Sequence, residues 1–367
     1  MDIISSLADD PTLFSPTVIV IACGAGLLLI SCIFPSLIYP NRAAGSECRM
    51  DEPFKGKAKA KITSIYVYPI KSCGGHSVQQ AKLGSRGLEM DRQWIIADAN
   101  RRFLSQRRHP KMALISPSLP AHNDDALVLS APGMPSIEVP VMRRIGSGGP
   151  EKGGELVDVQ VWNDLCRGVD QGLPVALWLR KFLEMEGLTL LRMEDGSRRP
   201  TDPDYGLGFE VNFSDGFPLN IAAEESLQEL NSRMASEEAI GMDRFRPNLV
   251  VRGWGAFAED EWTKIRTGRI PMRTPKPCSR CQVPMTNQRT LERGKEPTET
   301  LQTFRTGTHI GHPNPSWAKK VFFGMNVLPE ARGIIRVGDE MEVLRVLKRT
   351  PGEQTDKKSS APGLKDD

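Results

Sequence analysis

Two cysteine thiols, three positions apart, are the residues of this chain best suited to chemistry. Cys278 and Cys281 lie in the segment PKPCSRCQVPMTN (275–287), with the basic residues Lys276 and Arg280 close by. Neighbouring cations favour the thiolate, which is the form of cysteine that binds metals and attacks electrophiles. The pair could therefore hold a structural zinc ion, form a redox disulfide, or supply one sulfur to a redox metal that an organic cofactor also binds.

The sequence carries features against the first two of these alternatives. A four-ligand zinc site would need His309 and His312, but the gap after the cysteines is then about twice the usual length and the histidine spacing is one residue short. A thioredoxin-like disulfide stands at the start of a helix, whereas Pro275, Pro277 and Pro284 surround this pair. The spacing therefore favours a thiolate that completes a cofactor-bound redox metal, with zinc and a disulfide as alternatives.

The composition of the chain excludes some broad classes of function. The 367 residues are 39% hydrophobic and 25% charged, which is enough for about two globular domains. A net charge of +3 is too small to indicate nucleic-acid binding, which needs a concentrated basic surface. The cysteines are odd in number, seven in all, and they do not suggest the disulfide framework of a secreted domain.

An uncharged apolar run near the N-terminus predicts a membrane anchor. Residues 17–39 contain no charged side chain, and as a helix they would cross the roughly 30 Å of a bilayer core. The segment before the run (1–16) carries aspartates and no basic residue, unlike a signal peptide. Several Lys and Arg residues follow it, so the bulk of the chain is predicted to face the cytosol. A polar tether is expected over 40–60, and a buried core helix is the alternative for the run.

Short strand-like segments predict a mainly β fold. They are rich in β-branched and aromatic residues and are separated by turn residues, which favours a closed or sandwiched β structure. These segments are 61–70, 92–98, 112–116, 126–130, 136–142, 155–162, 248–254 and a terminal hairpin over 333–346 with its bend at Gly338-Asp339. Apolar periodicity predicts helices over 173–187 and 223–236. The fold class is therefore mainly β with helices (α+β), in two parts that join near the first of these helices and follow one transmembrane helix.

Seven segments occur in the order typical of MOSC-domain proteins. They are YPIKSCGG (68–75), GLEMDRQWIIAD (87–98), FLSQRRHPKMALI (103–115), DRFRPNLVV (243–251), CSRC (278–281), KEPTETLQTFR (295–305) and FGMN (323–326). The chain resembles this family, and within it the membrane-anchored mitochondrial amidoxime-reducing components, over about residues 60–346. The resemblance implies a MOSC N-terminal β-barrel-like domain (61–185) and a MOSC β-barrel domain (186–346). The polar and charged composition of residues 347–367 predicts a disordered tail.

The resemblance also implies a cofactor and the residues that bind it. The cofactor is a molybdenum ion held by molybdopterin and one cysteine thiolate, and the second cysteine of CSRC, Cys281, matches that ligand. Cys278 is then a packing thiol or a thiol that lies close to the metal ligand. The residues that match cofactor contacts are Lys71, Ser72, Arg92, Arg246, Ser279 and Arg280. Gly216, Phe217 and Asn326 occupy three further contact positions, where animal members have Thr, Ser and Tyr.

By the same resemblance, the reaction is the reduction of N-hydroxylated compounds such as amidoximes and hydroxylamines, with the oxygen atom taken from N–OH to molybdenum. No G-x-G-x-x-G motif follows a predicted strand, so NADH binding is not expected. The resemblance implies that cytochrome b5, reduced by NADH-cytochrome b5 reductase, supplies the electrons, and that the protein is anchored in the mitochondrial outer membrane.

The alternative is a non-catalytic MOSC module that carries the cofactor or sulfur. Such proteins usually carry a pyridoxal-phosphate domain upstream, for which the residues before the first strand are too few.

Overall fold

The computed structural model describes residues 21–23, 26–28, 51–56, 59–119, 126–141, 154–235 and 239–348. The chain divides into two units, residues 1–46 and 47–367. In the first unit, β1 (Ile21–Cys23) and β2 (Gly26–Leu28) pair as antiparallel strands. The remaining residues of that unit, the predicted segment 1–16 among them, lie outside the described residues. So do most of the predicted anchor over 17–39 and the predicted tail beyond Lys348.

At the six described residues of the apolar run, the expected helix is not found. The backbone there is extended, and β-branched residues such as Ile21 together with Gly26 lower the helix propensity of the run. Within the part of the chain that the structure describes, no helix is both long and apolar enough to cross a membrane.

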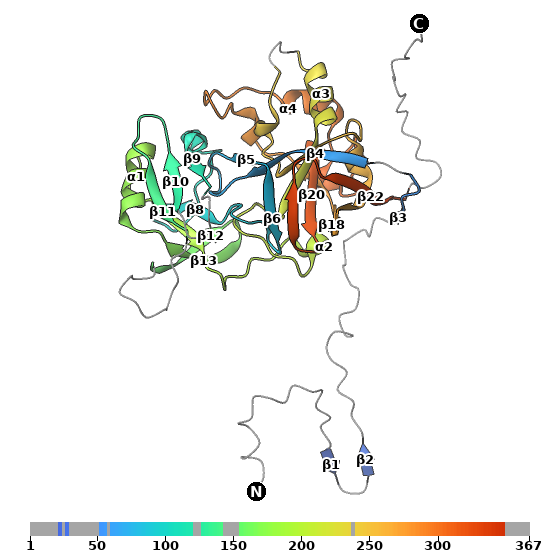
Figure 1. Cartoon of the computed structure of the whole chain (residues 1–367), viewed down its shortest axis with the longest axis horizontal. Helices are drawn as coiled ribbons and strands as arrows, with labels where there is room; N and C mark the ends of the chain where they lie inside the picture. The colour runs from blue at the N-terminus through green and yellow to red at the C-terminus, as the bar shows by residue number, and fades with distance from the viewer. Residues whose placement is uncertain are drawn as a thin grey trace. The chain divides into compact units, whose positions relative to one another are not determined.

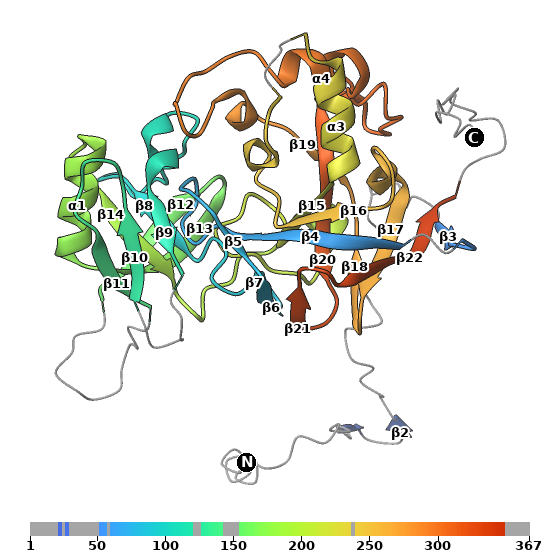
Figure 2. The same cartoon turned by 45° about the horizontal axis from the view of Figure 1, so that its top comes forward.

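Seven of the described strands in the second unit close into a barrel (Figure 1, Figure 2). Pairing of the last strand with the first, with Met341 opposite Ala60, completes the ring. Only one neighbouring pair in the ring, β15 and β16, is parallel. In spatial order the strands are β22 (Glu340–Leu347), β17 (Trp262–Thr267), β18 (Ile270–Arg273), β20 (Phe322–Pro329), β15 (Leu219–Ala223), β16 (Leu249–Arg252) and β4 (Lys59–Val67).

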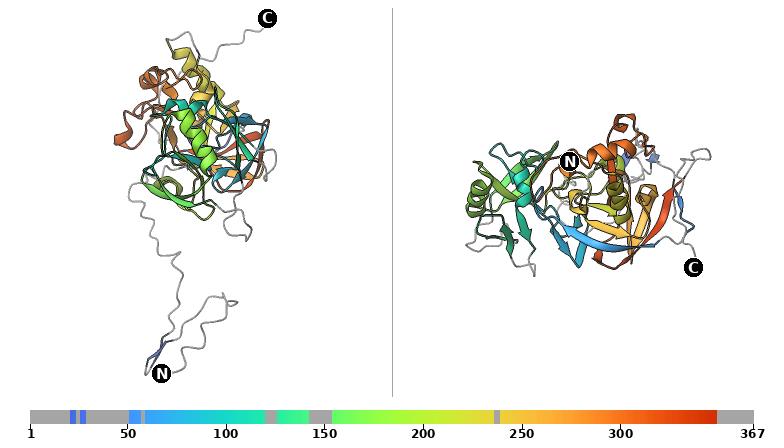
Figure 3. Two further views of the ribbon diagram at one scale, coloured as in Figure 1. Left: turned by 90° about the vertical axis from the view of Figure 1, so that its left-hand side faces the viewer. Right: turned by 90° about the horizontal axis from the view of Figure 1, so that it is seen from above.

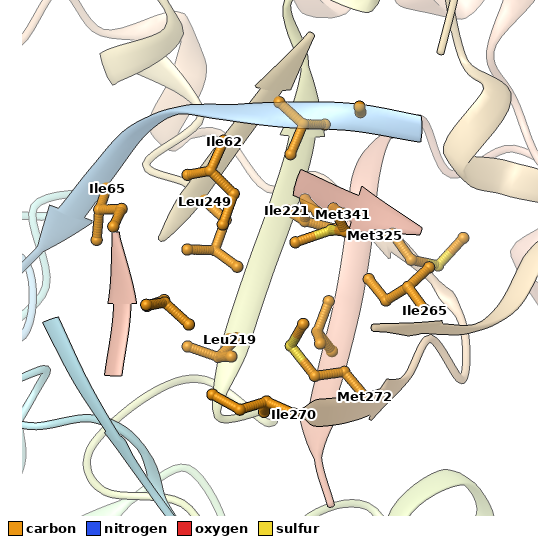
Figure 4. Close-up of a cluster of buried hydrophobic side chains, with 14 of the residues drawn as sticks. Ile62, Ile65, Leu219, Ile221, Leu249, Ile265, Ile270, Met272, Met325 and Met341 are labelled. Atoms are coloured by element: carbon orange, nitrogen blue, oxygen red, sulfur yellow. The ribbon is translucent and has the colours of Figure 1, made fainter. Parts of the chain in front are cut away.

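The barrel is filled by side chains from its own strands. Figure 4 shows apolar residues of different strands pointing toward one another, and Ile65, Ile221, Ile265 and Met272 are completely buried. Full burial of such a side chain contributes about 1.5–3 kcal/mol. A barrel packed in this way has no room for a ligand inside it, so a binding site has to lie at its end or outside its wall.

Three short strands lie at the edges of the barrel. They are β3 (Asp51–Pro53), β5 (His76–Val78) and β19 (Pro277–Ser279), which pair with β22, β4 and β20 respectively. Residues 51–53 thus pair with the barrel although they fall within the predicted tether. Pairing of β19 with β20 places the cysteine segment beside a barrel strand.

Helices cover one side of the barrel and bury a separate aromatic cluster. α3 (Glu224–Arg233) packs against β15 and β16, and α4 (Thr298–Phe304) packs against α3 (Figure 2). Beneath them the rings of Phe245 and Phe323 stack with centroids 3.8 Å apart. This cluster fixes the segment that precedes β16 against β20, and both of those segments reach the candidate site.

The N-terminal part of the second unit holds two further antiparallel sheets (Figure 3). α1 (Leu173–Leu183) packs between them through a buried face that includes Trp178, Leu179 and Phe182. One sheet has the order β12 (Leu156–Val161), β13 (Asp164–Asp170), β14 (Thr189–Met193) and β8 (Trp94–Ala97), and the other has β11 (Ile137–Pro140), β10 (Ala126–Ser130) and β9 (Ser116–Ser118).

The remaining described elements are short. β6 (Gln80–Gly84) pairs with β7 (Gly87–Leu88) and with β21 (Gly333–Arg336). α2 (Pro203–Gly206) is a single turn that begins at Asp202, whose carboxylate accepts a hydrogen bond from Asp204 N. The mainly β fold with few helices is confirmed.

Two local predictions are wrong. Residues 110–114 form a 3₁₀-helix rather than a strand, because Pro110 fixes the backbone of its first turn. Residues 333–346 do not form a hairpin, since β21 pairs with β6 whereas β22 pairs with β17, β4 and β3. The chain does bend at Gly338 (φ +93°), but closure of the barrel draws the two strands into different sheets.

Candidate cofactor-binding site

A cavity of about 180 Å³ lies where loops at the barrel meet loops of the N-terminal sheets. Its walls come from the loops after β4, β7 and β8, from the segments that precede β15 and β16, and from β19, its following loop and β20. All the residues predicted as cofactor contacts line it: Lys71, Ser72, Arg92, Gly216, Phe217, Arg246, Ser279, Arg280, Cys281 and Asn326. The fold thus brings together positions far apart in the sequence, while their roles stay predictions.

Three of these residues have backbone conformations that side chains rarely adopt. Ser72, Arg92 and Arg246 have φ angles of +69°, +48° and +54°. A non-glycine residue in this region costs about 1–2 kcal/mol, and such residues cluster at binding sites. Backbone hydrogen bonds hold all three: the turn that contains Ser72 is closed by Cys73 N, which donates to Ile70 O (3.1 Å), while Arg92 N donates to Tyr68 O (2.7 Å) and Arg246 N to Asp243 O (3.2 Å).

Arg92 is held by a buried carboxylate and an aromatic ring. Its Nη1 donates to both oxygens of Asp91, at 2.7 and 2.6 Å, and its guanidinium lies 4.2 Å from the centroid of the Tyr68 ring. Burial raises the pKa of Asp91, and the charge of Arg92 opposes this shift. The carboxylate neutralises much of the charge of Arg92, which makes Arg92 chiefly a fixed donor.

Arg246 differs because none of the described residues supplies it with a carboxylate. Its guanidinium lies 4.2 Å from the same Tyr68 ring, and burial lowers its pKa below the usual range for arginine. Arg246 is half-buried, and a cation withdrawn from water in this way is costly without an anionic partner unless a ligand supplies the negative charge. Arg246 is therefore the residue of this cavity best placed to receive an anion.

Lys71 is buried and already forms an ion pair. Its Nζ donates to Asp215 Oδ1 at 2.5 Å and to Phe213 O at 2.8 Å. Burial would raise the pKa of Asp215, but the charge and hydrogen bond of Lys71 outweigh it and hold that pKa below its usual range. Lys71 therefore brings little net charge to the cavity, and its contact with the 213–215 segment positions one wall.

Arg280 is held almost entirely by backbone carbonyls. Nε donates to Phe323 O at 2.7 Å, Nη1 to Phe245 O at 2.9 Å and Nη2 to Asn220 Oδ1 at 3.1 Å. No described carboxylate pairs with it, so its positive charge remains available in the cavity beside the cysteines. Gly324 makes this geometry possible, since a Cβ there would lie 2.7 Å from Ile221 O and 3.2 Å from Arg280 Nη2.

The two cysteines differ in exposure. Cys281 is exposed, whereas Cys278 is half-buried, and burial raises the pKa of the Cys278 thiol. Only the accessible thiol is well placed to bind a metal at the cavity surface. The histidines that a zinc site would need, His309 and His312, do not line this cavity.

The other predicted contacts are smaller features of the wall. Ser279 ends β19, and Asn326 Nδ2 donates to Pro277 O at 3.4 Å across the β19–β20 pair. A Cβ at Gly216 would meet no atom within 4 Å, so packing does not require glycine there. The Phe217 ring lies 5.1 Å from Lys276 Nζ.

Several lining residues were not predicted. Arg244, Asn220, Asn248 and Arg107 also face the cavity. Arg244 donates to Pro284 O at 2.7 Å. It lies two residues before Arg246 in the segment DRFRPNLVV, and this proximity could have predicted that it lines the cavity. No local pattern marks Asn220, a strand residue that bonds Arg280 only after β15 and β20 have paired.

Cys73 is not part of the site. It is completely buried in the core of the N-terminal part, and burial raises its pKa to about 12. Its environment is that of a packing thiol.

Profiles of two known domain families match consecutive parts of the chain. The MOSC N-terminal beta barrel domain matches residues 59–186, and the MOSC domain matches residues 209–342. Fold and site therefore define a MOSC-domain protein that carries both domains.

Known proteins match over most of this region. Mitochondrial amidoxime-reducing component 1 of Mus musculus is 30% identical over 294 residues, which cover 77% of this chain and 82% of that protein. Mitochondrial amidoxime reducing component 2 of Bos taurus is 30% identical over 76% of this chain and 81% of its own. The chain belongs to the MOSC-domain family of the mitochondrial amidoxime-reducing components.

Two more distant similarities complete the comparison. Molybdenum cofactor sulfurase of Bombyx mori is 29% identical over 66% of this chain but only 30% of its own length. The crystal structure of the YUAD protein from Bacillus subtilis covers 80% of this chain and 99% of its own, with 11% identity and a TM-score of 0.31. That structural likeness is too low to carry an argument.

Proposed function

We propose that the protein is a molybdopterin-dependent oxidoreductase that reduces N-hydroxylated compounds such as amidoximes and hydroxylamines. The observation that carries this proposal is that the exposed thiol of Cys281 shares one cavity with the cations Arg246 and Arg280, neither of which has a described carboxylate partner. The names of the amidoxime-reducing and sulfurase relatives support a function related to molybdenum.

The residues of the cavity fit a metal-bound pterin that ends in a phosphate. A thiolate is a suitable ligand for a soft redox metal, and Cys281 supplies an accessible one. Arginine recognises phosphate through paired donors, and the half-buried Arg246 carries a charge that lacks a described carboxylate. The hydroxyls of Ser72 and Ser279 add neutral donors to the same walls.

When bound, the cofactor supplies the two-electron chemistry that removes oxygen from an N–OH group. The chain's own residues hold it in place. Cys281 binds the metal, Arg246 and Arg92 orient the phosphate end, and the paired Lys71 and Asp215 keep one wall fixed. Arg280, with its donors bound to carbonyl oxygens, places a positive charge beside the metal ligand.

The electron donor and the location of the protein belong to the same proposal. Electrons come from cytochrome b5 and NADH-cytochrome b5 reductase, and the apolar run over 17–39 anchors the chain in the mitochondrial outer membrane with the catalytic part in the cytosol. The supports are the resemblance to the family, the charge pattern around the run and the mitochondrial names of relatives. Anchoring on the donor's own membrane would raise the effective concentration of each partner.

Metal content and turnover of the two cysteine variants test the proposal. The purified full-length protein is expected to contain molybdenum and to reduce benzamidoxime with an artificial electron donor. Cys281→Ala should abolish turnover, whereas Cys278→Ala, the matched control, should keep most of it. Zinc in place of molybdenum, or full activity of Cys281→Ala, would refute the proposal.

A second candidate is a carrier of the cofactor or of sulfur. The similarity to a molybdenum cofactor sulfurase over 66% of this chain favours it. This alternative predicts a persulfide on a cysteine, detectable as one added sulfur by mass spectrometry, together with no turnover of N-hydroxylated compounds. Turnover that depends on Cys281 excludes it.

A further inference from the structure

A second, larger hollow adjoins the cofactor cavity. Its volume is about 480 Å³, and it shares Phe103, Ser105 and Arg107 with the wall of the first cavity. Gln282, the residue that follows Cys281, also lines it. A molecule bound there lies next to the segment that carries the proposed metal ligand, and the volume is in the range of pockets that hold small ligands.

Aromatic side chains form one side of this hollow. The Trp162 ring packs edge to face against Phe103, with centroids 5.0 Å apart, and is 40% exposed. Trp162 Nε1 donates to Asp215 at 3.2 Å, which holds the indole in place. Trp162 and Asn163 form the two-residue turn between β12 and β13, and such a turn accounts for the φ of +57° at Trp162. A fixed, partly exposed indole offers a surface on which a flat ring can stack.

The polar side of the hollow is cationic. Arg102, Arg107 and Arg108 line it, and no Asp or Glu among the described residues does. Within the described residues, none of the three guanidinium groups forms an ion pair, and that of Arg107 lies 4.5 Å from the Trp162 ring centroid. Backbone hydrogen bonds fix the segment that carries them, because Gln160 N donates to Arg101 O (2.9 Å) and Arg108 N to Ser105 O (3.0 Å). Such a surface attracts an anion more strongly than a neutral polar group.

We propose that this hollow is the substrate-binding site and that it selects flat aromatic N-hydroxylated compounds that carry an anionic group, such as a carboxylate. The ring stacks on Trp162, the anionic group binds Arg107 and Arg108, and the N–OH end extends toward Cys281. This inference rests on the proposed function for the reaction at the N–OH end, but the binding preference can be measured without turnover.

Two compounds that differ only in charge test this preference in the full-length protein. 4-Carboxybenzamidoxime and its neutral analogue 4-carbamoylbenzamidoxime are titrated by calorimetry at low ionic strength. The carboxylate is expected to bind about tenfold more tightly or better, since a hydrogen bond to a charged group contributes more than a neutral one. High salt should reduce this difference because the site is open to solvent.

Substitutions of residues that line the hollow test whether the preference for the carboxylate arises there. The double variant Arg107→Gln, Arg108→Gln is expected to remove the preference for the carboxylate, so that the two compounds bind with equal affinity. Trp162→Leu should weaken the binding of both compounds, because it removes the stacking surface. The control is Arg269→Gln, Arg332→Gln, which removes the same charge from exposed positions of another cavity and should change neither affinity.

The outcomes separate this inference from the proposed function. Equal affinity of the wild type for both compounds overturns the inference, even if benzamidoxime is reduced. Charge-dependent binding without reduction of either compound supports the inference and counts against the proposed function. If the Arg107, Arg108 variant alters only the rate with a protein electron donor and not the binding of the carboxylate, the hollow serves that donor and the inference is overturned.

Discussion

Arg92 Nη2 donates a hydrogen bond to the backbone carbonyl of Arg246 at 3.2 Å. The two arginines are far apart in the sequence, and both lie over the ring of Tyr68. Among the described residues, Arg92 has a carboxylate partner, Asp91, and Arg246 has none. The two arginines therefore have different roles. Arg92 fixes the backbone of Arg246, and the charge of Arg246 is available to a ligand.

This division predicts unequal effects on retention of the cofactor. Arg246→Gln should lower the amount of bound molybdenum and pterin by about tenfold or more, since a charge-assisted contact with phosphate contributes about 1.5–3 kcal/mol. Metal analysis and pterin fluorescence of the purified variant measure the loss. The control is Arg252→Gln, an exposed residue that pairs with Glu224. Equal retention by both variants would contradict the role given to Arg246.

Gly324→Ala is predicted to disturb Arg280. The glycine has φ +71°, and an added Cβ would lie too close to Ile221 O and Arg280 Nη2. The expected loss is about 2–3 kcal/mol in the free energy of unfolding, together with reduced molybdenum content. Gly133→Ala is a matched control, since its φ is +73° and nothing lies within 4 Å of its Cβ position. In this control the free energy of unfolding should fall by only roughly 1 kcal/mol, which is the cost of a left-handed backbone at a residue with a Cβ.

The raised pKa of Glu259 predicts that the free energy of unfolding falls as the pH rises. Burial raises its pKa from 4.5 to about 7, and its carboxyl lies within hydrogen-bond distance of Ser226 Oγ. Between these two values the folded protein keeps a proton that the unfolded chain releases, so stability decreases through this window. Urea unfolding measures the free energy of unfolding at each pH. Between pH 5 and 8 this free energy should fall in the wild type by on the order of 2 kcal/mol more than in Glu259→Gln.

The control for this prediction is Glu299→Gln, an exposed glutamate on α4. Its pH profile should follow that of the wild type. A wild-type profile parallel to that of Glu259→Gln would show that Glu259 does not hold its proton in the folded state.

Asp215→Asn is predicted to leave Lys71 as a buried ammonium without a carboxylate. Removal of one partner of a fully buried pair costs about 3–5 kcal/mol, but Asp215 is 70% exposed at its side chain, so about 1–2 kcal/mol is expected. The pKa of Asp215 is lowered in the folded protein, so the contribution is present above about pH 4 and is lost as the pH falls.

Urea unfolding at pH 7 and at pH 3 checks the size and the pH dependence of this effect. The double variant Lys71→Met, Asp215→Asn removes both charges and should be more stable than Asp215→Asn alone. A single variant as stable as the wild type at pH 7 would show that Asp215 does not offset the buried charge of Lys71.

Much of the site could be predicted from short segments of the sequence. Cys281, Arg246 and Lys71 lie in local motifs that are specific as an ordered set, and all of them reach the cavity. Asn220 and Asp215 carry no such signal, because their part in the site depends on contacts with Arg280 and Lys71 that form only in the folded chain. The terminal hairpin was predicted wrongly for a related reason: a turn at Gly338 does not specify which strands pair beyond it.

The sequence by itself determined which residue types are available for the chemistry, since the spacing of the cysteines and the strand and helix periodicities are properties of neighbouring residues. Only the tertiary structure decided which cations are neutralised: Lys71 and Arg92 meet carboxylates, whereas Arg246 and Arg280 do not meet one among the described residues. The physical reason is that charge pairing depends on distances of a few ångströms between distant segments, and closure of the barrel sets those distances.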